Sequence, residues 1–449
     1  MYTLPTLNTD NEDINLAYRI AMGDIYSNIA SFRDGLLTEP KPVLLAGAGY
    51  KKPWTRDAAI NIWNGSGLIL SEISKNTLLS TVIEEKGVRR IGGEYWDAII
   101  WTIGAEWYLK YTGDEEFLPF VAEVTENALA YFEDTEFDAQ RNLFRGPACY
   151  GDGISAYPDR YATGQCGIMR VVDLKTDCSV KKGVGIPMYT LSTNCLYYES
   201  YNVAYRLTKK EEYRQKADRM KEAINRQFWN EKSGQYNYIV DEWGGCDYSE
   251  GVGQSFAVLF GIADEEKTKS IIRRQTISAN GIPCIDGTFS RYEGRGIPRH
   301  AKTVWPQIQA FWADAVAKHD IKKFEFEFNA LTKNVKRCGY FAEVYHPDTG
   351  DPYGGIQEWQ GKFVQWPSEI RQTWAATGYL RMILFDLFGM RFEREGIYIK
   401  PLKTDVAENL KLRDLRYRNI VLDIFVSGKN YGKEVFVSAG ENGKIEINL

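Results

Sequence analysis

The sequence predicts an all-α fold, a toroid of six helical hairpins, (α/α)6, followed by a small C-terminal antiparallel β appendage. Stretches rich in alanine and aromatic residues alternate with amphipathic stretches along most of the chain, and one turn pattern recurs between them. After Gly389 the pattern changes to short runs typical of β-strands. We therefore expect two domains, a helical toroid over residues 1–388 and the β appendage over residues 389–449.

The helices are expected in pairs of one outer and one inner helix. In the outer helices apolar residues recur every three or four positions, as Tyr213, Ala217, Met220 and Ile224 do, and charges fill the other face. The expected outer helices span 12–35, 74–86, 115–133, 210–228, 264–277 and 321–336. The expected inner helices, which carry few charges, span 57–72, 93–111, 189–207, 252–261, 302–318 and 367–385.

A weak internal repeat supports this pairing. Residues 108–117 resemble residues 204–213: in both, an aromatic-rich helix end meets a Thr, two further residues and then Glu-Glu-aromatic. Thr208 and Glu211 have the spacing of a capping box, so we expect an outer helix to start there.

The last 60 or so residues are expected to form strands over 396–401, 420–426 and 434–438. Asn442-Gly443 predicts a β-hairpin between 435–439 and 444–449, because tight hairpin turns need the positive φ angles that Asn and Gly accept. No linker rich in Gly, Ser or Pro precedes this region, so we expect it to pack on the helical body.

Composition excludes several classes of protein. With 449 residues, 44% hydrophobic and 26% charged, the chain can bury a large core, so it is neither disordered nor a disulfide scaffold. The net charge of −5 disfavours a nucleic-acid partner. Three His, seven Cys without CxxC pairs and no glycine-rich nucleotide motif lead us to expect no metal and no cofactor. No apolar run could span a membrane and the first residues lack a signal-peptide core, which predicts a cytoplasmic protein unless a signal was removed.

Six long connections lead from an outer helix to the next inner helix, so they should share one rim of the toroid, where function is expected. They span 36–56, 87–95, 134–188, 229–251, 278–301 and 337–366. Aromatic rings in a polar cleft can stack on sugar rings, although core packing is the alternative. We expect sugar contacts from Trp54, Trp96, Trp305, Trp359 and Trp366, with Asp97 beside them. Tryptophans within inner helices, Trp374 among them, are expected in the core.

Two connections hold a carboxylate surrounded by aromatic residues rather than by charges. Asp152 lies in Gly-Asp-Gly within 146–158, and Glu343 lies in 339–350. An acid in apolar surroundings is harder to ionise, as a general acid requires, and an ionised partner can activate water. Two such carboxylates are the minimum for glycoside hydrolysis. The alternatives are an Asx-turn for Asp152 and a solvated loop carboxylate for Glu343.

Three motifs carry a resemblance to a known family. Trp54-Thr-Arg56-Asp57 forms Trp-x-Arg-Asp, residues 343–350 form Glu-x-x-x-Pro-x-Thr-Gly, and residues 151–158 form a looser Gly-Asp-Gly-x-Ser-x-Tyr-Pro. In the order that they take along the chain, these motifs resemble those of the inverting glycosidases of the six-hairpin toroid class: glucoamylases, trehalases, processing α-glucosidases and mannosylglycerate hydrolases.

The resemblance implies a role for each motif. Arg56 and Asp57 would clamp hydroxyls of the terminal sugar, Glu343 would be the general base and Asp152 the general acid. An ion pair at a helix start is the alternative for Arg56 and Asp57. The third motif departs from the trehalase-type pattern at Gly151, where that pattern has Trp. Other acids in neighbouring connections are therefore kept as alternatives for the general acid: Glu250, Glu293 and Asp159.

We thus expect an inverting, exo-acting α-glycosidase that acts on an oligosaccharide or small glycoside. Other functions remain open on the same toroid. A sugar epimerase usually needs paired His bases, and only His300 lies at the start of an inner helix. A polysaccharide lyase would favour a basic cleft, and a non-catalytic carbohydrate-binding protein would not need Glu343.

Overall fold

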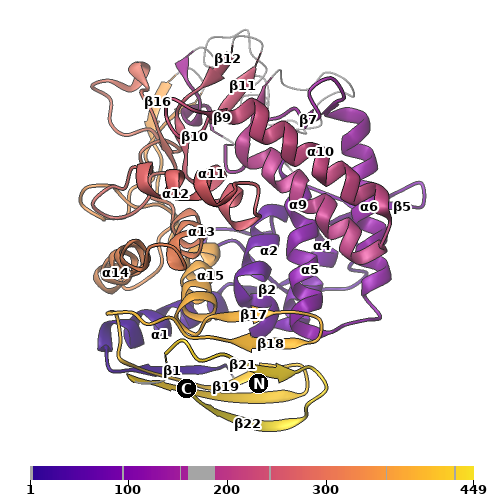
Figure 1. Cartoon of the computed structure of the whole chain (residues 1–449), viewed down its shortest axis with the longest axis vertical. Helices are drawn as coiled ribbons and strands as arrows, with labels where there is room; N and C mark the ends of the chain where they lie inside the picture. Colours follow the sequence, from indigo (N-terminus) through magenta and orange to yellow (C-terminus); the bar gives the residue numbers. More distant parts are fainter. Residues whose placement is uncertain are drawn as a thin grey trace.

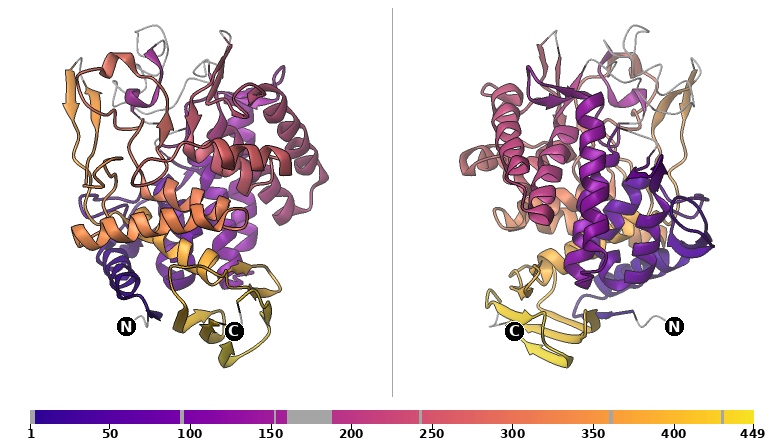
Figure 2. Two further views of the ribbon diagram at one scale, coloured as in Figure 1. Left: turned by 60° about the vertical axis from the view of Figure 1, so that its left-hand side comes forward. Right: turned by 90° about the vertical axis from the view of Figure 1, so that its right-hand side faces the viewer.

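The computed structural model describes residues 4–93, 96–151, 153–159, 188–241, 244–359, 362–428 and 431–449, except for the side chain of Trp359. Figure 1 shows a helical body with small strands at one end and the C-terminal sheets at the other. The C-terminus and the first described strand, residues 6–9, lie at the end of the molecule that carries the C-terminal sheets (Figures 1 and 2).

Six inner helices form a closed ring. Their neighbours in space follow the chain order, and the last helix packs against the first. Inner helices are buried nearly all round: every residue of α2 is buried, and in α13 only Asp314 is not. The inner helices are α2 (Thr55–Asn61, extended through Ile62–Ser66 and α3, Gly67–Ile69), α5 (Trp101–Thr112, after a turn over Ala98–Ile100), α9 (Leu191–Thr208), α11 (Gly251–Leu259), α13 (Pro306–Ala317) and α15 (Thr373–Arg381, extended through Met382–Leu387).

Six outer helices pack around this ring. They bury one face only, as α10 does with Tyr213, Ala217, Met220, Ile224 and the residues aligned with them. The outer helices are α1 (Glu12–Ser27), α4 (Ser71–Ser80), α6 (Leu118–Thr135), α10 (Glu211–Phe228), α12 (Glu265–Arg274) and α14 (Ile321–Cys338). The predicted alternation of inner and outer helices is thus found in the described part of the chain.

The all-α prediction is wrong in one respect: the outer-to-inner connections carry small antiparallel sheets. Two predicted helix ends, 29–35 and 82–86, fall in such strands. Each strand is only two to four residues long, too short for a period-2 pattern to mark it in the sequence. The strands are β2 (Ile29–Phe32), β3 (Lys41–Leu44), β4 (Val82–Glu85), β5 (Val88–Ile91), β6 (Phe137–Asp138), β7 (Leu143–Phe144), β8 (Tyr189–Thr190), β9 (Trp229–Asn230), β10 (Gln235–Tyr236), β11 (Ile239–Asp241), β12 (Gly244–Cys246), β13 (Ser249–Glu250), β14 (Ile285–Asp286), β15 (Ile356–Trp359) and β16 (Lys362–Gln365).

The C-terminal strands form two sheets with the help of the N-terminus. β1 (Thr6–Thr9) joins β19 (Asn409–Tyr417), β20 (Ile420–Ser427) and β22 (Gly443–Asn448). β17 (Met390–Phe392), β18 (Gly396–Ile399) and β21 (Val435–Ser438) form the other sheet. The N-terminal strand was not foreseen in this sheet, and the two-domain division at residue 389 stays a prediction.

The predicted hairpin at Asn442-Gly443 is wrong. β21 and β22 lie in different sheets, and β22 pairs with β20 in parallel. Gly443 does take the positive φ expected of a turn, +88°, but the chain uses it to cross between sheets. The capping box is also wrong, because the Thr208 hydroxyl donates to the Ala204 carbonyl of its own helix. The two repeated segments do share one structure, because each ends an inner helix with a Thr whose hydroxyl donates to the carbonyl four residues earlier, that of Tyr108 for Thr112.

The ring is filled by aromatic side chains at the level of the middle of its helices. Trp63 packs on Phe256 and Phe311 with ring centroids 6.0 and 4.7 Å away, and Arg381 stacks over Trp63 at 4.7 Å. Within the described residues, no helix combines the length and apolar character needed to cross a membrane.

Candidate active site

Every inner helix begins at the end of the toroid that carries the long connections, and predicted site residues sit at these starts. Asp57 lies in the first turn of α2, and Asp97 precedes the turn that leads into α5. Glu250 and Trp305 occupy the positions directly before the first turns of α11 and α13. Helix N-terminal ends carry partial positive charge, so carboxylates and oxygen-rich ligands are favoured at this rim.

Arg56 and Asp97 form a buried ion pair. Arg56 Nη1 lies 2.9 Å from Asp97 Oδ2, and the two residues are 7% and 1% exposed. The pair joins α2 to α5, two neighbours in the inner ring. An ion pair at the start of α2 was the alternative to a hydroxyl clamp, and the structure shows that the partner is Asp97. Asp57, in the same helical turn, is also buried.

Two aromatic rings enclose this ion pair. The Arg56 guanidinium lies 5.3 Å from the Tyr150 ring and 5.8 Å from the Trp374 ring. Those rings meet edge to face at 5.7 Å. Trp374 was expected in the core, yet it also contacts Trp305 at 6.1 Å and so connects the Arg56 side of the site to the Trp305 side.

Glu343 is a buried carboxylate held by three donors. Arg299 Nη2 donates to Oε2 at 2.7 Å, and the Glu369 backbone N–H approaches the same oxygen at 3.3 Å. The Tyr50 hydroxyl lies 3.4 Å from Oε1. Glu343 is 4% exposed, so it is not the solvated loop carboxylate of the alternative interpretation. These three donors, one of them the Arg299 cation, hold the carboxylate in one orientation, as a general base requires.

Local pairing brings Glu343 to the start of α13. Tyr345 and Val304 exchange two backbone hydrogen bonds of 2.8 and 3.0 Å, which places the Glu343 segment beside the residue that precedes Trp305. The Arg299 guanidinium lies 4.8 Å from the Trp305 ring, and the His300 ring stacks on Trp305 at 5.0 Å. The base candidate and a predicted sugar-binding Trp thus share one cation.

The predicted general acid, Asp152, lies outside the described residues. Its flanking residues are described and are held near the Trp305 side. A Cβ on Gly153 would meet His300 Nδ1 at 2.7 Å and Gln357 Oε1 at 2.4 Å. His300 therefore contacts both the loop that carries Asp152 and the Trp305 ring. It is 2% exposed, and His319 and His346 lie outside this group, so the paired bases of an epimerase are not assembled among the described residues.

The three alternative acids differ sharply in their surroundings. Glu250 is 1% exposed and accepts a 3.0 Å hydrogen bond from the Ser192 backbone, and burial raises its pKa to about 8. Asp159 is paired with Arg291 at 2.8 Å. Glu293 is exposed. Glu250 has the raised pKa that a general acid needs, but it is buried against the Ser192 backbone and has almost no exposed surface.

The remaining predicted tryptophans occupy different depths. Trp96 is buried and donates from Nε1 to the Ala148 carbonyl at 3.0 Å. Trp54 is half-buried beside Tyr50 and under Lys52, whose Nζ lies 4.7 Å from the ring. Trp366 is half-buried in the last connection. The side chain of Trp359 lies outside the described part of the chain.

Sequence reasoning missed several residues of this site: Tyr50, Tyr150, Ser192, Arg299 and Trp374. Arg299 and Tyr50 did leave a signal, since each stands a few residues before a predicted Trp, in Arg-His-Ala-Lys-Thr-Val-Trp and Tyr-Lys-Lys-Pro-Trp. Ser192 belongs to a polar run, Thr190-Leu-Ser-Thr-Asn194, at the start of an otherwise apolar inner helix. A polar run at the buried start of a helix indicates that its side chains form hydrogen bonds with the backbone of a neighbouring segment.

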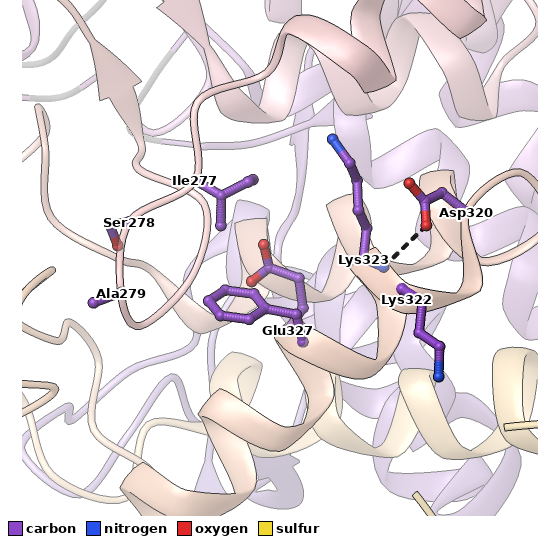
Figure 3. Close-up of a pocket in the computed structure, with 8 residues that line it drawn as sticks. Ile277, Ser278, Ala279, Asp320, Lys322, Lys323 and Glu327 are labelled. Atoms are coloured by element: carbon purple, nitrogen blue, oxygen red, sulfur yellow. Dashed lines mark hydrogen bonds between the residues drawn. The ribbon is translucent and has the colours of Figure 1, made fainter. Parts of the chain in front are cut away.

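A separate pocket of about 450 Å³ lies on the outside of the toroid, between residues 277–279 and the start of α14 (Figure 3). It is lined by none of the predicted site residues. Glu327 lines it, and burial raises the pKa of this carboxyl to about 8. Elsewhere in the described residues, no group of three or more His, Cys, Asp or Glu side chains is arranged to hold a metal ion.

Residues 201–363 match the family model of the mannosylglycerate hydrolase MGH1-like glycoside hydrolase domain. The match contains Glu343 and Trp305, whereas Arg56, Asp57 and Asp152 precede it. No curated protein shows a significant match to the sequence. The match bears out the prediction of a glycoside hydrolase domain over residues 201–363.

Solved structures share the fold at low sequence identity. A sialidase matches with a TM-score of 0.69 and 14% identity over 98% of this chain, which spans 40% of that protein. The GH63 mannosylglycerate hydrolase from Thermus thermophilus, in complex with glucose, matches with a TM-score of 0.59 and 12% identity over 82% of this chain and 100% of that one. The neutral trehalase from Saccharomyces cerevisiae gives 0.51 and 11% over 81% and 78%. With the family match, these neighbours confirm the resemblance to six-hairpin glycosidases.

Proposed function

We propose that this glycoside hydrolase is an inverting, exo-acting α-glycosidase that removes the terminal sugar of an oligosaccharide or small glycoside. The observation that carries the proposal is the Glu343 carboxylate, which is buried, ion-paired with Arg299 and set beside Trp305 at the rim where all inner helices begin. Such a carboxylate is pre-positioned to accept a proton from water.

In this mechanism Glu343 deprotonates a water molecule below the sugar ring while Asp152 protonates the glycosidic oxygen. Inversion requires the two carboxyl groups to be roughly 6.5–9.5 Å apart, which leaves room for that water. Contacts through His300, Trp305 and Arg299 connect the loop that carries Asp152 to Glu343. This continuity supports the pairing of the two residues.

Sugar recognition in the proposal falls to the Arg56 side of the site. Asp97 fixes the guanidinium of Arg56 at 2.9 Å, so its remaining donors are held in one orientation. A fixed cation and a neighbouring carboxylate, Asp57, suit a pair of adjacent hydroxyls on a terminal sugar. The buried Trp374 and Tyr150 rings give this end an apolar wall. The side chains of Trp63, Phe256 and Phe311 fill the middle of the ring, so a substrate would enter from the rim, which favours exo-action.

The test is the release of free sugar from a panel of α-linked disaccharides, followed by NMR that resolves the anomer first formed. We expect one disaccharide to be cleaved with inverted configuration. Retained configuration would contradict the inverting mechanism. Binding of sugar without release would instead identify a carbohydrate-binding protein, and an unsaturated product would identify a lyase.

A further inference from the structure

The four residues that precede Asp152 form a turn closed by one hydroxyl group. The Tyr157 hydroxyl donates to the Gly151 carbonyl at 2.7 Å and accepts from the Ala148 N–H at 3.1 Å. The Gly151 N–H donates to the Ala148 carbonyl at 2.9 Å. One oxygen atom of Tyr157 therefore joins both ends of the turn.

Side chains at the starts of two inner helices hold the same turn from outside. Trp96 donates to the Ala148 carbonyl at 3.0 Å, and the Tyr150 N–H approaches Asp97 Oδ2 at 3.4 Å. The Cys149 N–H donates to the Ser192 hydroxyl at 2.9 Å. Each backbone N–H from residue 148 to residue 151 thus has a partner, which leaves this buried loop little freedom.

The turn also contains a strained residue. Tyr150 has φ = +66°, a left-handed conformation that a bulky side chain rarely adopts, and it is 1% exposed. Strain of this kind persists only where the surroundings fix it, and it concentrates at functional sites. Here the Asp97 contact to its N–H and the Arg56 and Trp374 contacts to its ring fix it.

Gly151 completes the arrangement. A Cβ at this position would lie 2.2 Å from the Tyr157 hydroxyl oxygen. The hydroxyl occupies the space that a side chain at 151 would need, which gives a physical reason for the glycine at the position where the trehalase-type pattern has Trp.

The residues after Asp152 are fixed as well. Arg291 donates from Nη2 to the Ile154 carbonyl at 2.7 Å and from Nη1 to the Tyr157 carbonyl at 2.8 Å. The Ser155 hydroxyl donates to Gln357 Oε1 at 3.0 Å. The chain on both sides of residue 152 is therefore held by partners from several elements.

We propose that Tyr157 is a positioning residue for the general acid: its hydroxyl fixes the Ala148–Gly151 turn, which immediately precedes Asp152 in the chain. The proposal rests on the proposed function, in which Asp152 is that acid. Tyr157 does not exchange a proton with the substrate, so its contribution depends on how much leaving-group protonation a substrate needs.

The test is Tyr157→Phe, which removes one oxygen and keeps the ring stacked on Tyr238 at 6.1 Å. We expect kcat on an unactivated glycoside to fall about 10- to 100-fold, the effect of a small misplacement of a reacting group. On a fluoride or activated aryl glycoside we expect kcat to stay within about 3-fold, because these leaving groups need little protonation. Ser192→Ala, which releases the same turn at Cys149, should give the same pattern.

The control is Tyr18→Phe, since the Tyr18 hydroxyl is also buried and donates to a backbone carbonyl, that of Pro5, at 2.8 Å. We expect it to leave both activities unchanged. If Tyr157→Phe keeps wild-type kcat on both glycosides, or loses both equally, the positioning role is wrong. Failure of the proposed function is distinguishable: Asp152→Asn would then lose both glycosides equally, and the positioning role would fall with it.

Discussion

Arg299 donates to Glu343 across 2.7 Å, and each residue is less than a tenth exposed. The cation also donates to the Gly354 carbonyl at 2.9 Å, so its fork is fixed by two partners. A buried pair of this kind is costly to break from one side, because the remaining charge stays buried and uncompensated. The first two predictions follow from this geometry.

Glu343→Gln should abolish turnover and leave sugar binding measurable. The amide keeps the shape of the side chain but cannot take a proton from water, so kcat should fall by about 10²–10⁴-fold. Stopped assays of sugar release and calorimetric titration with the product sugar check the two parts. Glu231→Gln, which changes an exposed carboxylate in the connection over residues 229–251, is the matched control and should retain wild-type kcat.

Arg299→Lys should lower kcat by about 10-fold or more, although the charge is kept. Lys cannot bond Glu343 and Gly354 at once, and it stacks less well on the Trp305 ring. Steady-state kinetics on the best substrate measure the loss. Arg413→Lys, which changes an exposed side chain on β19, is the control for the substitution itself. Wild-type kcat in Arg299→Lys would mean that the fork does not position the base.

Asp57→Ala should cost transition-state binding of the terminal sugar. Hydrogen bonds from such a clamp bind the transition state more strongly than the ground state. The loss of Asp57 should therefore lower kcat/KM at least about 10-fold. The control is Asp13→Ala, because Asp13 also lies in the first turn of a helix but on the outer helix α1. If Asp57→Ala keeps full kcat/KM on the best substrate, the clamp assignment fails.

The alternation of buried and amphipathic segments predicted the ring because each helix is long enough to show its own period. The small rim strands and the position of β22 could not be predicted from the sequence, because both depend on strand partners that tertiary packing determines. The same limit applies to the site. Motifs located Arg56 and Glu343, but their partners Asp97 and Arg299 are 41 and 44 residues away in sequence.

Trp374 shows why a helix position alone is a poor guide. It lies in the first turn of an inner helix, where core packing was expected, and it is indeed 3% exposed. Yet it contacts Arg56, Tyr150 and Trp305. In a ring whose helices all start at the active rim, the first turn of an inner helix belongs to the site and only the later turns belong to the core.

Glu250 should make the folded state less stable as pH rises. Burial raises its pKa to about 8, whereas in the unfolded chain a Glu titrates near 4.3. Between these values the unfolded chain releases a proton that the folded protein keeps. The stability contributed by this group is therefore complete below about pH 4.3, and it declines until about pH 8.

Glu250→Gln removes this titration and keeps an acceptor for the Ser192 N–H. The unfolding temperature of this variant minus that of wild type should increase between pH 5 and pH 8. The increase should correspond to up to a few kcal/mol of unfolding free energy. Thermal unfolding at several pH values measures the difference, with the exposed Glu441→Gln as the control. A difference that does not change with pH would contradict the raised pKa.

Asp152→Asn should lower kcat strongly on natural glycosides and much less on activated glycosides. A poor leaving group must be protonated as the glycosidic bond breaks, so loss of a general acid should lower kcat by about 10²–10⁴-fold. A fluoride or activated aryl leaving group departs without that proton. Glu343→Gln provides the contrast, because water must be activated for every substrate and its loss should be equally severe on both.

The informative quantity is the ratio of the two losses. Asp152→Asn should lose far more on the natural glycoside than on the activated one, and the basic limb of its pH–rate profile should vanish with the acid. Equal losses would deny Asp152 the acid role, and Glu250 would be the next acid to test by the same ratio, since burial already raises its pKa. If azide restored activity to Glu343→Gln and gave an adduct of retained configuration, the sugar would have passed through a covalent intermediate on another carboxylate. The mechanism would then be retaining, with Glu343 as its acid/base rather than the base of an inverting reaction.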